Sequence, residues 1–88
     1  MTRAEVLAWL DTRRPVPPDA LRARLRDAVQ DSPAGLVAHL AQLGRELLDG
    51  VAARPAGGRE LALDLLAADA FATYAFEAQA EEGSLHET

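Results

Sequence analysis

The sequence predicts one small all-α domain, a bundle of four helices at about residues 3–13, 18–30, 33–50 and 59–82, the first two short and the last long. Three observations predict this fold class. Apolar residues recur at helical spacing in four segments. Clusters of proline and glycine separate these segments. Strict apolar–polar alternation is absent and β-branched residues are few, so the pattern predicts no strand.

The first two helices are bounded by a capping motif and by prolines. Thr2 and Glu5 fit a capping box, in which each side chain accepts a hydrogen bond from a free backbone N–H at the helix start. Pro15 disfavours helical geometry at the residue before it, so the first helix should end near Arg13. One of the prolines at 17–18 fits the first turn of the second helix, because its missing N–H costs nothing there. The segment between the two helices should be a short, stiff connector.

The third helix carries the clearest amphipathic pattern of the chain. Its apolar stripe consists of Leu36, Leu40, Leu43, Leu47 and Val51. Ser32 suits the N-cap of this helix and Pro33 its first residue. Gly50 offers a left-handed stop, and Gly44 would let a neighbouring helix come close. A loop at 54–58 should lead into the fourth helix.

The long segment at 59–82 is apolar on two separate faces. One strip consists of Leu61, Leu65, Ala68, Ala72 and Phe76. The other strip consists of Leu63, Ala67, Ala70, Phe71, Tyr74 and Ala78. Because so short a chain has a thin core, we expect one strip to pack in the bundle and the second strip, as candidate protein interface, to pack on a partner. The alternative, in which both strips are buried within one chain, stays open. The domain spans 1–82, and a flexible C-terminal tail is expected at 83–88.

Charge is distributed unevenly along the chain, whose net charge is −5. Residues 1–30 hold six arginines against four acids, whereas residues 31–88 hold three arginines against ten acids. The acids of the last helix lack a cation three or four residues away, so they need partners elsewhere. We expect the second helix to lie against the fourth. The candidate charge-pairing residues are Arg22, Arg24 and Arg26 on one side and Asp64, Asp69 and Glu77 on the other.

Several classes of function are disfavoured by the composition. An acidic chain is repelled by nucleic-acid phosphates, so general nucleic-acid binding is not expected. The chain has no cysteine, and neither His39 nor His86 has a partner at metal-ligand spacing, so both are interpreted as solvated. No catalytic, cofactor-binding or metal-binding residue is expected. The chain also lacks a run of 18 apolar residues, so no membrane partner is expected.

These observations predict a non-enzymatic, cytoplasmic helical module for protein interaction or assembly, whose partner is a second copy in a homodimer or another helical protein. Two alternatives stay open. One is a small nucleic-acid-binding regulator that uses the N-terminal arginines Arg13, Arg14, Arg22, Arg24 and Arg26. The other is a helical carrier of a small ligand, held in a pocket near Trp9, Phe71 or Tyr74.

Overall fold

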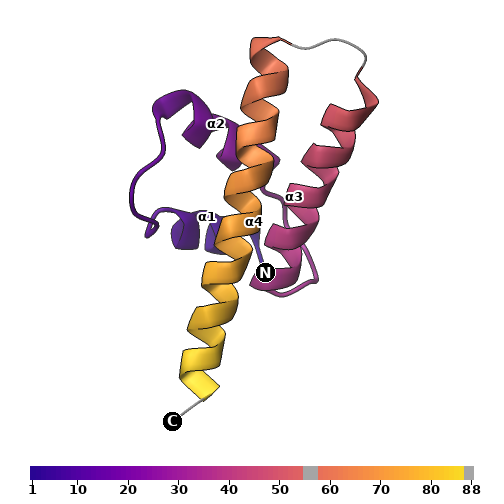
Figure 1. The fold of residues 1–88 in the computed structure, drawn as a ribbon. Helices are drawn as coiled ribbons and strands as arrows, with labels where there is room; N and C mark the ends of the chain where they lie inside the picture. The colour runs from indigo at the N-terminus through magenta and orange to yellow at the C-terminus, as the bar shows by residue number, and fades with distance from the viewer. Residues whose placement is uncertain (55–57, 87–88) are drawn as a thin grey trace.

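The structure, a computed structural model, describes residues 1–54 and 58–86. It is all-α, and these residues contain no strand. The four helices are α1 (Arg3–Leu10), α2 (Asp19–Ala28), α3 (Leu36–Ala53) and α4 (Arg59–His86) (Figure 1). The predicted fold class, with two short helices first and a long one last, is confirmed.

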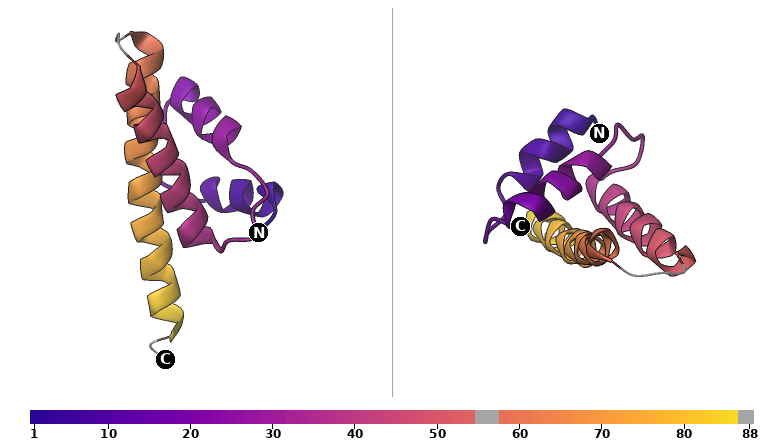
Figure 2. Two further views of the ribbon diagram at one scale, coloured as in Figure 1. Left: turned by 90° about the vertical axis from the view of Figure 1, so that its right-hand side faces the viewer. Right: turned by 90° about the horizontal axis from the view of Figure 1, so that it is seen from above.

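Helices α3 and α4 run antiparallel and form the main packed pair of the molecule (Figure 1). Both short helices lie on the same side of this pair, with α2 packed against α4 (Figure 2). The opposite side of the pair is uncovered. The C-terminal part of α4 extends beyond the other helices, which gives the molecule its length of 49 Å against widths of 23 and 21 Å.

The hydrophobic core lies where α1 and α2 meet the α3–α4 pair. Phe71 is its largest fully buried side chain, with no exposed surface. The other buried members of the core cluster are Val6, Leu25, Val29, Leu40, Leu43, Ala67, Ala75 and Ala78. Several of these are alanines, and their small side chains let the neighbouring helices approach α4 while Phe71 fills the space between them.

Helix α4 lies close to α3 at Gly44, where the sequence predicts that a neighbouring helix can come close. A Cβ atom added to this residue would lie 3.2 Å from the carbonyl oxygen of Ala68 and 3.4 Å from Cβ of Phe71. Gly44 is therefore level with residues 68–72 of α4, and this contact fixes the register of the pair.

Both short helices are shorter than predicted. The Thr2–Glu5 capping box is present, but α1 ends at Leu10 rather than near Arg13. The N–H groups of Thr12 and Arg13 bond to carbonyls three residues back, so the chain tightens into a turn before the proline. Helix α2 likewise spans Asp19–Ala28 and not 18–30, because the residues on either side of it have extended backbone geometry.

The long helices differ from the prediction at their ends. Ser32 accepts a hydrogen bond from the N–H of Ala34 within a turn, so α3 begins later, after Gly35. The helix continues through Gly50, which has no positive φ, to Ala53. Helix α4 likewise continues beyond residue 82 to His86, because a glycine at 83 weakens a helix by only about 1 kcal/mol. The predicted tail at 83–88 is thus helical through residue 86, and residues 87–88 lie outside the described part.

Candidate functional site

The burial of the two apolar strips of α4 corrects their assignment. Ala67, Phe71 and Ala78, from the strip expected at a partner, are at most 1% exposed within the single chain. The remaining members of that strip, Leu63, Ala70 and Tyr74, are half-buried. This strip therefore packs in the chain's own bundle, because its small residues admit the neighbouring helices closely.

The other strip of α4 is exposed at Leu65, Ala72 and Phe76, on the uncovered side of the helix pair, whereas its Ala68 is buried and its Leu61 is half-buried. Phe76 is 74% exposed and Leu65 is 43% exposed, although both side chains are large and apolar. On α3, Leu48 is 50% exposed one turn after Gly44. Large apolar side chains gathered on one face typically mark a binding surface.

A shallow groove of about 260 Å³ runs between α3 and α4 on this side. It is lined from α3 by Val37, Ala41, Gly44 and Arg45, and from α4 by Ala72, Ala75, Phe76 and Gln79. We call the groove together with Leu48 and Leu65 the outer face. Its charged groups are Arg45, in the lining, and Asp69, which lies two turns before Phe76 on the same side of α4.

The expected charge pairing between α2 and α4 is present at Asp64. The Nε of Arg24 lies 2.6 Å from Oδ1 of this carboxylate, and Arg54 donates a hydrogen bond to its other oxygen. The hydrogen bonds from Arg24, and then from Arg54, hold the pKa of Asp64 below its usual value, although burial acts in the opposite direction. Asp64 thus joins α2, the end of α3 and the start of α4.

The other candidate charge-pairing residues have different partners. Arg22 and Arg26 both contact Oδ1 of Asp11, at 3.2 and 2.8 Å. Glu77 lies 3.5 Å from Arg13, which also contacts Glu81 at 3.1 Å. Asp69 is exposed, and no ion pair involving it is found among the described residues.

These ion pairs bear on the nucleic-acid alternative. Its expected arginines Arg13, Arg22, Arg24 and Arg26 each face a carboxylate of the same chain. Guanidinium groups held by carboxylates contribute less to binding a phosphate backbone, because a pair must first be broken. The arrangement therefore gives this alternative no specific support.

Aromatic contacts fix the end of α1 against α4. The rings of Trp9 and Tyr74 meet edge to face, with centroids 6.1 Å apart. The guanidinium of Arg13 lies 3.9 Å above the centre of the Trp9 ring, and Nε1 of Trp9 donates a hydrogen bond to Glu81. This cluster anchors the connector between α1 and α2.

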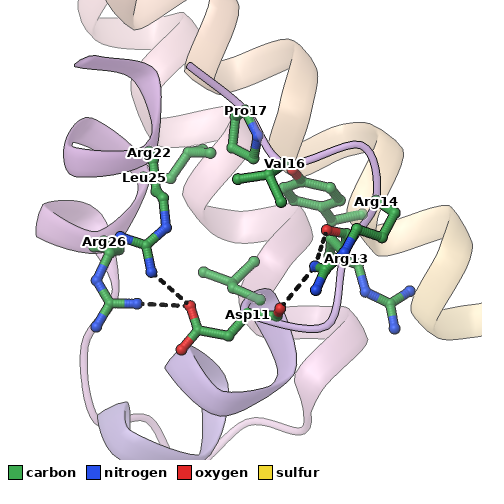
Figure 3. A pocket seen from close by; sticks show the side chains of 10 residues that line it. Asp11, Arg13, Arg14, Val16, Pro17, Arg22, Leu25 and Arg26 are labelled. Carbon is green, nitrogen blue, oxygen red and sulfur yellow. Dashed lines mark hydrogen bonds and ion pairs between the residues drawn. The ribbon is translucent and has the colours of Figure 1, made fainter. Parts of the chain in front are cut away.

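A pocket of about 230 Å³ lies between that connector and α2 (Figure 3). Its apolar wall consists of Leu10, Val16, Pro17, Leu25 and Tyr74. Its charged lining consists of Asp11, Arg13, Arg14, Arg22 and Arg26. We call this the arginine pocket. Burial, and then the Glu77 carboxylate, raise the pKa of Tyr74, so its hydroxyl stays protonated at neutral pH.

His39 is buried, contrary to the expectation of a solvated side chain. It is 4% exposed, and its Nε2 accepts a long hydrogen bond of 3.5 Å from the N–H of Gln30. The segment that joins α2 to α3 covers this face of α3, which the helical pattern alone could not reveal. Burial lowers the pKa of His39, although the Glu46 carboxylate acts in the opposite direction.

We expect the folded protein to lose stability as the pH falls from 7 to 5. The unfolded histidine takes up a proton near pH 6.5, whereas folded His39 does so only at lower pH. The contribution of neutral His39 to the free energy of unfolding is therefore fully present above about pH 6.5, and it decreases as the pH falls below that value. Urea unfolding at a series of pH values measures this loss, and the His39→Gln variant should lack this part of it. An equal loss in both proteins would contradict the assignment.

No group of three or more potential metal ligands comes together in the described part of the chain. Over the same residues, no helix has the length and hydropathy that crossing a bilayer requires. Comparison with protein-family models, with curated proteins and with solved structures finds no match to this chain. The outer face and the arginine pocket are the two candidate functional sites of the molecule.

Proposed function

We propose that this protein is a non-enzymatic helical assembly module that forms a homodimer through the outer face. The observation that carries this proposal is the exposure of Phe76, at 74%, beside the apolar groove. Leaving a phenylalanine in water forgoes about 1.5–3 kcal/mol of burial free energy, which a partner would recover.

The size of the outer face suits a dimer. Helix α3 has 18 residues, so the face is about 27 Å long, and two adjacent helices make it about 20 Å wide. The flat projection of this face is about 540 Å², which approaches the roughly 600 Å² per partner at the lower end of standard stable interfaces. Two helix pairs stacked face to face would make a four-helix core, with α1 and α2 on its outside.

The charges on the outer face favour a second copy as the partner. Because Gly44 is level with residues 68–72, Arg45 is level with Asp69 along the helix pair. A two-fold axis parallel to the helices would lay α3 of one copy over α4 of the other at the same level. Arg45 of each copy would then meet Asp69 of the other, twice in the dimer. Stacking α3 on α3 at this level would instead bring two copies of Arg45 together.

Phe76→Glu tests the proposal. The native protein should migrate at twice the 9.4 kDa of one chain at micromolar concentration, measured by size exclusion with light scattering. The variant should be monomeric, with a dissociation constant raised about 100-fold, because it loses the buried ring and places a charge in the interface. Leu66→Glu is the matched control, because Leu66 is 54% exposed on α4 but lies off the outer face. A native monomer, or equal effects of both variants, would refute the proposal.

A charge exchange in the same assay tests the stacking geometry. Arg45→Glu and Asp69→Arg should each weaken the dimer about tenfold, and the double variant should regain most of the lost affinity. If Phe76→Glu dissociates the dimer but the double variant shows no recovery, the outer face stands as the interface and the parallel two-fold arrangement is wrong.

A further inference from the structure

The arginine pocket carries more positive charge than its carboxylates neutralise. Arg13 is directed to Glu77 and Glu81, which leaves Arg14, Arg22 and Arg26 with Asp11. Arg14 donates hydrogen bonds to the backbone oxygens of Asp11 and Arg13, at 3.0 and 2.8 Å, and carbonyl oxygens carry no full charge. Three guanidinium groups therefore stand against one carboxylate, in a protein whose net charge is −5.

The two arginines of α2 also keep free hydrogen-bond donors. Arg22 and Arg26 share a single oxygen, Oδ1 of Asp11, with one N–H group of each directed at it (Figure 3). A guanidinium has five N–H donors and matches an oxyanion best when two of them bind in parallel. Their side chains are 47% and 33% exposed, so the unused donors are accessible to a ligand.

An apolar surface lies directly beside these donors. Val16 and Pro17 of the connector face Leu25 of α2 across the pocket (Figure 3). Val16 is 57% exposed, which leaves an apolar side chain at the rim uncovered. A bare phosphate would use the guanidinium groups and leave this wall unused, whereas a neutral apolar molecule would leave the charges uncompensated.

We propose that the arginine pocket binds a small organic anion that has an apolar, ring-sized body and a carboxylate head. The head binds the free N–H groups of Arg22 and Arg26, and the body lies on Val16, Pro17 and Leu25. The pocket volume of about 230 Å³ suits a molecule of one or two rings. The pocket is formed by the connector and α2, on the side of the molecule opposite the outer face, so this proposal does not depend on dimer formation.

Titration calorimetry with three probes tests the proposal on the full chain. Naphthalene-2-carboxylate should bind with a dissociation constant on the order of 100 µM, as the affinity per atom of small ligands allows. Naphthalene-2-carboxamide, which is neutral, and inorganic phosphate, which lacks the apolar body, should each bind at least tenfold more weakly. If either of them binds as tightly as the carboxylate, the proposed ligand class is wrong.

Variants locate the binding site. Arg22→Gln should weaken naphthalene-2-carboxylate at least tenfold, and so should Val16→Asp, which places a negative charge at the apolar rim. Both positions are exposed, and an unchanged circular dichroism spectrum establishes that each variant is folded. Arg59→Gln, at an exposed arginine remote from the pocket, is the matched control. Unchanged binding by either pocket variant, or an equal loss in the control, overturns the proposal.

Discussion

Phe71→Ala is expected to remove about 3–5 kcal/mol from the free energy of unfolding, enough to unfold a large part of the protein. The native side chain has no exposed surface and is the largest one fully buried in the core. Its removal loses the transfer free energy of the ring and leaves a cavity between helices that the alanines of α4 cannot fill. An 88-residue domain has a total stability of only about 4–13 kcal/mol.

The matched control for this variant is Phe76→Ala, the same substitution on the same helix at a side chain that is 74% exposed. It should cost less than about 1 kcal/mol of monomer stability. Urea unfolding followed by circular dichroism measures both variants, at a protein concentration low enough that the midpoint no longer depends on it. Similar losses for the two variants would mean that Phe71 is not the centre of the core.

Gly44→Leu is expected to destabilise the protein by about 2–3 kcal/mol through overpacking. Even the first added carbon would lie 3.2 Å from a backbone oxygen of α4, at Ala68, and a backbone atom cannot rotate away as a side-chain end can. To make room for the leucine side chain, α3 and α4 would have to move apart at the level of Gly44. The change should also weaken the proposed dimer, because the same contact shapes the groove of the outer face.

Gly50→Ala is the control with the opposite sign. A Cβ at this position has only the end of the Arg54 side chain nearby, at 3.9 Å, so the change should stabilise α3 by up to about 1 kcal/mol. Thermal unfolding of both variants provides the comparison. If Gly44→Leu melts at or above the native temperature, α3 and α4 are not in the close contact described.

The number, order and relative lengths of the helices follow from apolar periodicity and from the prolines, because both act locally. Helix ends were less predictable. Gly50 offers a stop signal in the sequence, yet such a glycine ends a helix where the chain turns left-handed, and Gly50 has no positive φ. The helix start predicted at Ser32 is wrong, because a serine that suits an N-cap also suits a turn, and α3 begins after Gly35.

The roles of the two strips of α4 could not be decided from the helical wheel. Both strips carry large apolar side chains, yet Leu65 and Phe76 of one strip are exposed whereas Phe71 of the other is fully buried. The decisive factor is the shape of the neighbouring elements, because the alanine-rich strip admits α2 closely. The shape of the neighbouring elements depends on the tertiary structure, so it cannot be read from the sequence of α4 alone. His39 was misjudged for the same reason, since the covering segment comes from another part of the chain.

The charge contacts were predictable in part. The attraction between α2 and α4 followed from the uneven distribution of charge, and Arg24 and Asp64 meet as that argument suggests. The role of Asp11 in holding Arg22 and Arg26 was missed. It depends on how the connector folds back, and the arginine pocket exists only because of that fold.

The projection of α4 beyond the other helices gives the proposed dimer a direction. A two-fold axis parallel to the helices keeps both copies pointing the same way, so the two projecting C-terminal parts of α4 emerge at one pole (Figure 1). The end of α3 and the start of α4 lie at the opposite pole (Figure 1). Such an assembly would be a rod with two different ends, and one end would be a tip formed by the C-terminal parts of both α4 helices. Whatever contacts that tip meets two copies of the same helix at once, and so binds with the advantage of two linked sites.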